Sequence, residues 1–210
     1  LKYKLLSGLL TTLIRIHSGC VVRSFPDFDH SQPVVFYSNH TSNLDFPVIW
    51  AALPRPMRSN VRPIAAADYW SKGKLRPFLA IRIFNALLIE RKSVSRENSP
   101  LPPMLDCLEN GQSLIVFPEG TRSLSGELGM IKSGSYHLAK SRPQTQFIPV
   151  YLENLFRILP KGEILPLPLV ATLNFGEPLK LQEQESKDEF LSRMQNKLLQ
   201  LKTEDISNDR

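Results

Sequence analysis

The sequence predicts an α/β fold in which a single domain holds a mostly parallel or mixed sheet flanked by helices. Short apolar runs alternate along the chain with longer segments of helical periodicity, which is typical of such sheets. A hydrophobic content of 42% with 22% charged residues suffices for a full core. The length of 210 residues, without an internal repeat or an evident linker, fits one domain.

The N-terminal half is expected to contain three helices and three strands. Residues 1–22 indicate a helix, because leucines and isoleucines are interspersed with Lys2, Lys4 and Arg15. Val34–Ser38 is a short apolar run after a proline and indicates a buried strand. The other expected elements are a helix at 42–53 that Ser42 or Asn43 caps, a loop at 54–63, a strand at 64–66, a helix at 71–84 that Pro77 interrupts, and a strand at 86–89.

The C-terminal half continues this alternation. Pro102 and Pro103 open a helix that runs through Glu109 and that Gly111 ends, since proline is favoured early in helices and glycine just after them. Residues 113–117 form the clearest buried strand. A helix at 133–141, strands at 146–151 and 169–175, and a helix at 187–202 are expected to follow. The final helix is amphipathic, and its apolar positions are Phe190, Leu191, Met194, Leu198 and Leu201.

Positive charge is concentrated in the first half of the chain. The net charge is +6, with 14 Lys and Arg against 6 Asp and Glu in residues 1–100, and 12 against 14 in residues 101–210. The basic half suggests an anionic partner, which is a membrane surface, a phosphate-bearing substrate or nucleic acid, although a solvated basic face explains the same composition. The two cysteines, Cys20 and Cys107, have no metal or redox spacing and fit a reducing compartment.

The N-terminal segment has the composition of a helix that lies in a membrane interface. The apolar run from Leu5 to Ile14 is ended by Arg15 and is shorter than the about 20 residues that cross a bilayer. No small-residue cleavage site follows, so a signal peptide is not predicted. We expect residues 1–24 to be a membrane-associating helix and residues 25–210 to be the main domain. The alternative for this segment is an ordinary core helix. If it does lie on a membrane, the basic and apolar residues at 70–84 would extend the membrane-binding surface.

The strand at Val34–Ser38 is directly followed by a polar group, Asn39-His40-Thr41-Ser42-Asn43-Leu44-Asp45. In open α/β sheets, sites gather at the carboxyl ends of strands. His40 and Asp45 can meet there only if His40 lies in the turn before the helix, because a spacing of five would separate them on one straight helix. The carboxylate would then fix the imidazole tautomer, and His40 could deprotonate a hydroxyl directly. Taken alone, this spacing is better explained by helix-capping residues and a loop histidine.

The strand at 113–117 is followed by a second group, Phe117-Pro118-Glu119-Gly120-Thr121-Arg122-Ser123. Glu119 can hold a hydroxyl, and Gly120 lets the backbone approach a ligand closely. The planar fork of Arg122 matches two phosphate oxygens. A glycine turn with a surface ion pair explains the same residues, so this group alone is only moderately specific.

Together, the two groups resemble the motifs of the glycerolipid acyltransferases, above all the 1-acylglycerol-3-phosphate acyltransferases. The first is similar to that family's Asn-His-x4-Asp motif, and the second to its Phe-Pro-Glu-Gly-Thr-Arg-Ser block. Leu88-Ile89-Glu90-Arg91 resembles a block that ends in a phosphate-binding arginine, although Glu90 stands where many members have aspartate. Lys132-Ser133-Gly134 and Ile148-Pro149-Val150 resemble two further blocks. The resemblance covers about residues 30–175 and leaves the C-terminal 35 residues without a motif.

The resemblance implies an O-acyltransferase in which His40 is the general base and Asp45 orients it. The donor would be acyl-CoA or acyl-acyl carrier protein, and the acceptor a lysophospholipid such as 1-acylglycerol-3-phosphate or a lyso-ornithine lipid. No cofactor and no metal is implied, and His17, His30 and His137 have no ligand spacing. The expected partners are the lipid acceptor, the cytoplasmic face of a membrane and, for one donor, acyl carrier protein. The implied substrate-binding residues are Arg91, Glu119, Gly120, Thr121, Arg122 and Lys132.

Two other classes of function remain open from the sequence. A hydrolase could use the His40–Asp45 pair to activate water, although the chain lacks the Gly-x-Ser-x-Gly elbow of a serine hydrolase. A non-catalytic membrane or nucleic-acid binding module would also suit the basic half. No recognised nucleic-acid motif is present, so a nucleic-acid partner is not expected.

Overall fold

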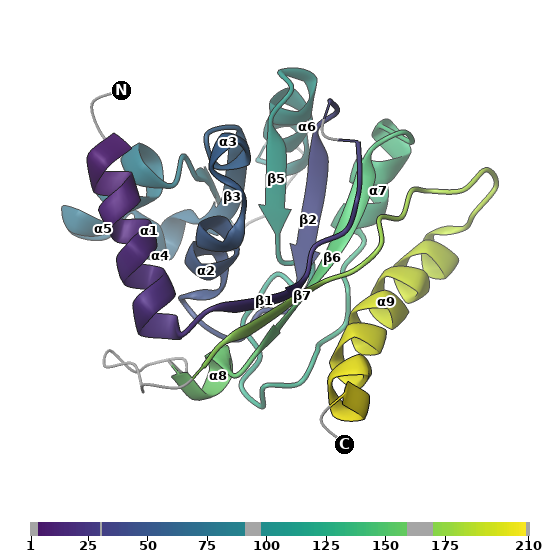
Figure 1. Ribbon diagram of the computed structural model, residues 1–210. Helices are drawn as coiled ribbons and strands as arrows, with labels where there is room; N and C mark the ends of the chain where they lie inside the picture. The colour runs from purple at the N-terminus through teal and green to yellow at the C-terminus, as the bar shows by residue number, and fades with distance from the viewer. Residues whose placement is uncertain (1–3, 30, 91–97, 159–169, 209–210) are drawn as a thin grey trace.

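A sheet between two layers of helices forms the centre of the protein (Figure 1). The computed structural model describes residues 4–29, 31–90, 98–158 and 170–208. Within these ranges the sheet has seven strands in the order β1-β7-β6-β2-β5-β3-β4. Their bounds are β1 Val21–Ser24, β2 Val34–Ser38, β3 Val61–Ala66, β4 Leu87–Ile89, β5 Ser113–Val116, β6 Gln146–Glu153 and β7 Thr172–Phe175.

The sheet is mixed, with a parallel centre. Strands β6, β2, β5, β3 and β4 pair in parallel, whereas β7 runs antiparallel to β6 and pairs in parallel with β1. The predicted single domain with a mostly parallel or mixed sheet is therefore confirmed. Parallel neighbours bring their carboxyl ends to the same edge, which gathers the segments after β2 and β5 at one place.

Strand β2 is the buried axis of this sheet. All five of its residues are buried, as expected for a central strand covered on both faces. Val34 and Phe36 pack into the core on one face, and Val35 and Tyr37 into the core on the other, because side chains alternate along a strand. The apolar run of this strand is continuous because its residues face two separate cores in turn.

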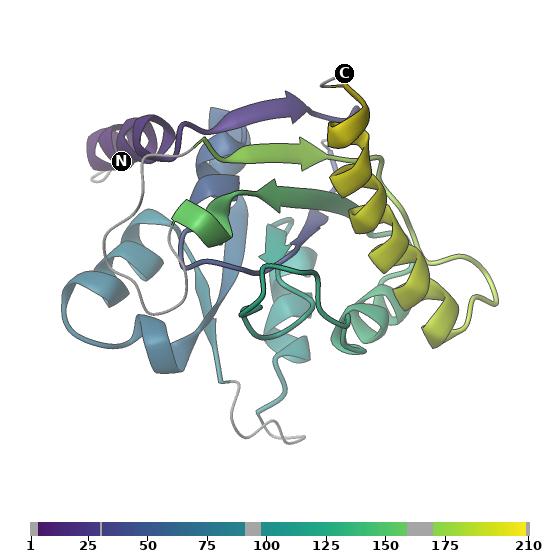
Figure 2. The same cartoon turned by 90° about the horizontal axis from the view of Figure 1, so that it is seen from below.

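Each face of the sheet carries its own layer of helices, as the two views in Figures 1 and 2 show. Helices α1 (Lys4–Ser18), α2 (Asp45–Ala52) and α8 (Leu155–Ile158) contribute to one core. Helices α6 (Leu101–Glu109), α7 (Gly134–Ser141) and α9 (Lys187–Asn208) cover the other. Four short helical segments complete the first layer: α3 (Arg55–Arg58), α4 (Ala67–Trp70), α5 (Leu75–Pro77) and the π-helical turn η1 (Phe78–Ile83).

The N-terminal helix is shorter than predicted. It ends at Ser18 instead of residue 22, because Gly19 adopts a left-handed conformation with φ of 53°. Cys20 N donates to Arg15 O at 3.2 Å and Gly19 N to Ile16 O at 3.3 Å, which is the bond pattern of a Schellman ending. Residues 21–24 form β1, the edge strand of the main sheet. The predicted boundary at residue 24 therefore separates this strand from the rest of its sheet. No helix in the described ranges is long and apolar enough to cross a membrane.

Two other helices differ from their predictions. The helix expected at 42–53 begins only at Asp45, and neither Ser42 nor Asn43 caps it through a side chain. The helix expected at 71–84 is divided into α5 and η1, with Gly73 at a φ of 70° before them and Pro77 as the last residue of α5. Proline lacks the N–H that an α-helix needs in its interior, so the predicted interruption at Pro77 is confirmed.

Candidate active site

The two predicted polar groups meet at the carboxyl ends of β2 and β5. These strands are parallel neighbours with Tyr37 opposite Val116, so the residues that follow them leave the sheet side by side. The main chain of His40 is bonded on both sides by the second group. Its N–H donates to Glu119 Oε1 at 2.7 Å, and its carbonyl accepts from Ser123 N at 2.7 Å. The second group therefore fixes the backbone of the first.

The side chains of His40 and Asp45 form the predicted pair. His40 Nδ1 lies 2.7 Å from Asp45 Oδ2, which also accepts from the N–H groups of Thr41 at 2.7 Å and Ser42 at 2.8 Å. Asp45 is fully buried, and its Oδ1 has no hydrogen-bond partner. Because a carboxylate only accepts, this bond assigns the proton of the neutral imidazole to Nδ1 and leaves the lone pair on Nε2. His40 thus lies in the turn before α2, as the spacing required.

The imidazole of His40 is held in place by an aromatic neighbour. It stacks on Phe117 with 4.2 Å between ring centroids and an interplanar angle of 21°. Its side chain is 18% exposed and lines a cavity. A largely buried ring that reaches a cavity and has one nitrogen bonded to a carboxylate has the geometry of a general base.

Asn39 fixes the point at which the chain leaves β2, a role that the sequence analysis missed. Its Nδ2 donates to Leu152 O at 2.9 Å, and its Oδ1 accepts from Leu152 N at 2.8 Å. These bonds extend the pairing of β2 with β6 one step beyond Ser38 and Val150, with a side-chain amide in place of a backbone amide. The main chain is therefore free to turn at residue 39. A polar residue directly after a buried strand was the available signal.

Glu119 lies behind the cavity wall rather than on it. It is 6% exposed and is not among the residues that line the cavity. Its Oε1 accepts from His40 N, and its Oε2 accepts from Gly129 N at 2.8 Å. Burial raises the pKa of Glu119 above its ordinary value, although both backbone hydrogen bonds lower it. Both carboxylate oxygens thus accept hydrogen bonds from the protein backbone, and the expected contact of Glu119 with a substrate stays a prediction.

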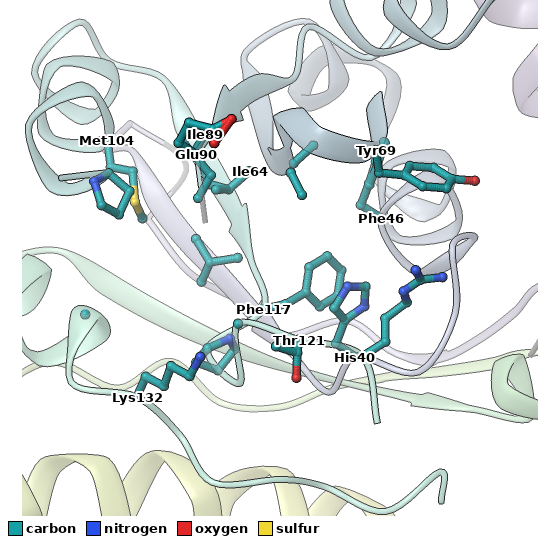
Figure 3. A pocket seen from close by; sticks show the side chains of 18 of the residues that line it. His40, Phe46, Ile64, Tyr69, Ile89, Glu90, Met104, Phe117, Thr121 and Lys132 are labelled. Atoms are coloured by element: carbon teal, nitrogen blue, oxygen red, sulfur yellow. The ribbon is translucent and has the colours of Figure 1, made fainter. Parts of the chain in front are cut away.

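The cavity beside His40 has a volume of about 550 Å³ and a largely apolar wall. In Figure 3, His40, Thr121 and Lys132 lie on one side of it, and Ile64, Ile89 and Met104 on the other. Such a volume is typical of small-molecule sites. No sequence pattern indicates its apolar wall, which comes from several separate segments: Phe46, Ile64, Trp70, Ile89, Leu101, Met104, Val116 and Leu138.

Two of the predicted cationic residues, Arg122 and Lys132, line the cavity. Arg122 lines it and donates through a terminal guanidinium nitrogen to Asn43 Oδ1 at 2.7 Å. Lys132 lines it as well, and its Nζ lies 2.8 Å from the position that a Cβ would take at Gly120. Gly120 has a φ of 72°, so glycine is favoured there by its backbone conformation. Arg91 lies outside the described residues.

Metal-binding side chains do not gather in this site. In the part of the chain that the structure describes, no three His, Cys, Asp or Glu side chains are placed to hold a metal ion. The sequence-based expectation of a reaction without a metal or cofactor stays a prediction.

Comparisons with known proteins agree with this site. A family model described as Acyltransferase matches residues 19–153. A probable 1-acyl-sn-glycerol-3-phosphate acyltransferase of Mycoplasma pneumoniae is 27% identical over 184 residues, which is 86% of this chain and 60% of the relative. The 1-acyl-sn-glycerol-3-phosphate acyltransferase alpha of Homo sapiens is 31% identical over 134 residues, which is 63% of this chain and 45% of the relative. The chain thus spans about half the length of these curated relatives.

A solved structure has the same fold. The crystal structure of the 1-acyl-sn-glycerophosphate acyltransferase PlsC from Thermotoga maritima superposes with a TM-score of 0.75 at 22% sequence identity. The match covers 93% of this chain and 77% of that protein. The fold predicted from the sequence is thus found in a second protein.

Replacing Glu119 by Gln should remove a pH dependence from the stability of the protein. A raised pKa means that the folded protein binds the proton more tightly than the unfolded chain. The contribution of Glu119 to stability is therefore present below the unfolded pKa and lost as pH rises through the folded pKa. Urea denaturation should be measured for the wild type and for Glu119→Gln at several pH values. As pH rises from about 4 towards neutrality, we expect the free energy of unfolding of the wild type to decrease relative to that of the variant. A relative stability that stays flat or rises would contradict this account.

Proposed function

The chain belongs to the acyltransferase family, and we propose that it transfers a fatty acyl group from a thioester donor to the free hydroxyl of a lysophospholipid. The acceptor that the named relatives favour is 1-acylglycerol-3-phosphate. The observation that carries the proposal is the His40–Asp45 pair at 2.7 Å on the wall of an apolar cavity. The cavity suits an acyl chain, and Arg122 on its wall suits a phosphate.

In the proposed reaction His40 acts as the general base. Its Nε2 takes the proton of the acceptor hydroxyl while the hydroxyl oxygen attacks the carbonyl carbon of the thioester. A C–O bond forms, the C–S bond breaks, and the thiolate leaves with the proton from the imidazolium. The Asp45 carboxylate stabilises the imidazolium through Nδ1. The products are an ester and a free thiol, from acyl-CoA or acyl-acyl carrier protein.

The residues around His40 have three roles in this proposal. Arg122, with Lys132 and Arg91, binds the phosphate and glycerol of the acceptor. Gly120 and Thr121 form the cavity wall beside them. Glu119 acts as a positioning residue, because its oxygens hold the N–H groups of His40 and Gly129.

Replacing His40 should abolish most of the acyl transfer. We expect His40→Ala to lower kcat by about 10²–10⁴-fold, the usual contribution of positioned proton transfer, and Asp45→Asn to lower it through the wrong tautomer. His137→Ala, at an exposed histidine on α7, is the matched control. Ester formation should be measured with both donors beside release of free fatty acid. Near wild-type turnover in folded His40→Ala would refute the mechanism, and fatty acid release without ester formation would identify a hydrolase.

Replacing Arg122 should weaken the use of a phosphate-bearing acceptor. Arg122→Ala should raise the acceptor KM more than it lowers kcat, since the lost bonds stabilise ground and transition states alike. Arg122→Lys should restore activity only in part, because the bidentate fork is lost. A lysolipid without a phosphate is the control substrate, and its KM should hardly change. An unchanged KM for 1-acylglycerol-3-phosphate in Arg122→Ala would show that this residue does not bind the phosphate.

We also propose that α1 attaches the protein to the cytoplasmic face of a membrane. Leu10 and Ile14 pack against the core. On the outer face, the exposed fractions are 92% for Leu5, 58% for Leu9 and 53% for Leu13. A helix with one packed and one bare apolar face suits the boundary of head groups and acyl chains. In this proposal α1 is at once a core helix on its packed face and an interface helix on its exposed face.

Polar residues on the outer face of α1 should release the protein from vesicles. Leu9→Gln with Leu13→Gln should lower vesicle binding more than tenfold, because burial of one leucine contributes about 1.5–3 kcal/mol. Leu199→Gln, at a leucine of α9 that is 39% exposed, is the control and should bind as the wild type does. Flotation with vesicles measures the effect, and circular dichroism checks the fold. Unchanged flotation of the folded double variant would show that the attachment lies elsewhere.

A further inference from the structure

Three arginines gather between α1, α2 and α3, at the end of α2 away from Asp45. Arg15 on α1 donates through Nε to Ala51 O at 2.9 Å, at the last turn of α2. Arg58 on α3 donates through a terminal guanidinium nitrogen to Thr11 Oγ1 of α1 at 2.6 Å. Arg55 precedes Arg58 by three residues on α3, a spacing that makes their side chains neighbours. All three helices belong to the same layer (Figure 1).

The arginine cluster, Arg15, Arg55 and Arg58, lacks a negative partner in the described residues. None of the three forms an ion pair with a described carboxylate. Arg58 is half-buried against Trp50, and its buried Nε has no hydrogen-bond partner. Burial and the positive charges of Arg15 and Arg55 lower the pKa of Arg58. Like charges this close repel one another, and a bound anion would offset that repulsion.

We propose that the arginine cluster is a binding site for a phosphate group, supplied by the head group of an anionic membrane lipid. Guanidinium groups match phosphate oxygens with paired hydrogen bonds, and Arg15 and Arg55 are exposed beside the half-buried Arg58. None of the three arginines lines the cavity beside His40. The site is therefore distinct from the one proposed for the acceptor.

The position of the cluster relative to α1 favours a lipid as the source of the phosphate. Thr11, which holds Arg58, is buried on the inner side of α1, whereas Leu9 and Leu13 are exposed. An interface helix buries its apolar face about 5–10 Å into the head-group boundary. A helix with its side chains is about 10–12 Å across, so its inner side lies at the level of the phosphates. This choice of source rests on the membrane attachment proposed above, but the phosphate site itself does not.

The phosphate site is tested with the full chain and inorganic phosphate. Phosphate should raise the Tm of the wild type above its value in chloride of the same ionic strength. Arg55→Gln should abolish this increase, and Arg58→Lys should reduce it, because the charge is kept but the fork is lost. Arg55 is exposed, so its variant remains informative if Arg58→Lys does not fold. The matched control is Arg142→Gln on the opposite layer, where Arg142 lies 3.8 Å from Glu109.

The source of the phosphate is tested by flotation with phosphatidylcholine vesicles, with and without phosphatidylglycerol. Arg55→Gln should lower binding to the anionic vesicles about fivefold, Arg58→Lys should also lower it, and Arg142→Gln should not. If the phosphate effect on Tm is lost in the variants but anionic vesicle binding is unchanged, free phosphate is the ligand and the lipid source is refuted. If Arg55→Gln and Arg58→Lys match the wild type in both assays, the site itself is refuted. Turnover of a soluble short-chain acceptor, which Arg55→Gln should leave unchanged, separates these outcomes from a failure of the proposed catalysis.

Discussion

The geometry of the site depends on how the main chain of His40 is held. Its N–H is bonded to the Glu119 carboxylate and its carbonyl to Ser123 N. The preceding residue, Asn39, is bonded twice to the main chain of Leu152. Three strands, β2, β5 and β6, thus fix one turn from both sides. With the backbone fixed, Asp45 need only hold the ring, which it does at 2.7 Å while also binding two N–H groups of the same turn.

This arrangement buries two carboxyl groups, and their burial costs free energy. Asp45 is fully buried with one oxygen unbonded, and Glu119 is 6% exposed with its pKa raised by that burial. Burial of a charged group costs free energy unless hydrogen bonds compensate. Apolar residues would fill the same positions more stably, but they could not hold the His40 backbone or the imidazole. Such groups are typical of sites where stability has been given up for function.

The sequence predicts local features of this protein well and distant ones poorly. The strand Val34–Ser38 and the position of His40 in the turn before α2 follow from the order of apolar and polar residues. The bonds of Asn39 to Leu152 join residues 113 positions apart, and a polar residue after a buried strand does not by itself indicate this partner. The two bonds from the Glu119 carboxylate to backbone N–H groups are likewise not indicated by its motif. The apolar cavity wall is equally invisible, because it combines residues from helices and strands that meet only in the folded sheet.

Helix α2 connects the proposed catalytic pair with the arginine cluster proposed to bind lipid phosphate. Asp45 opens it beside His40, and Ala51 near its end accepts a hydrogen bond from Arg15 of α1. Seven of its eight residues are buried, so the helix is packed between α1 and the sheet and cannot tilt without opening the core. The proposed catalytic pair and the arginine cluster thus contact opposite ends of one short, buried helix.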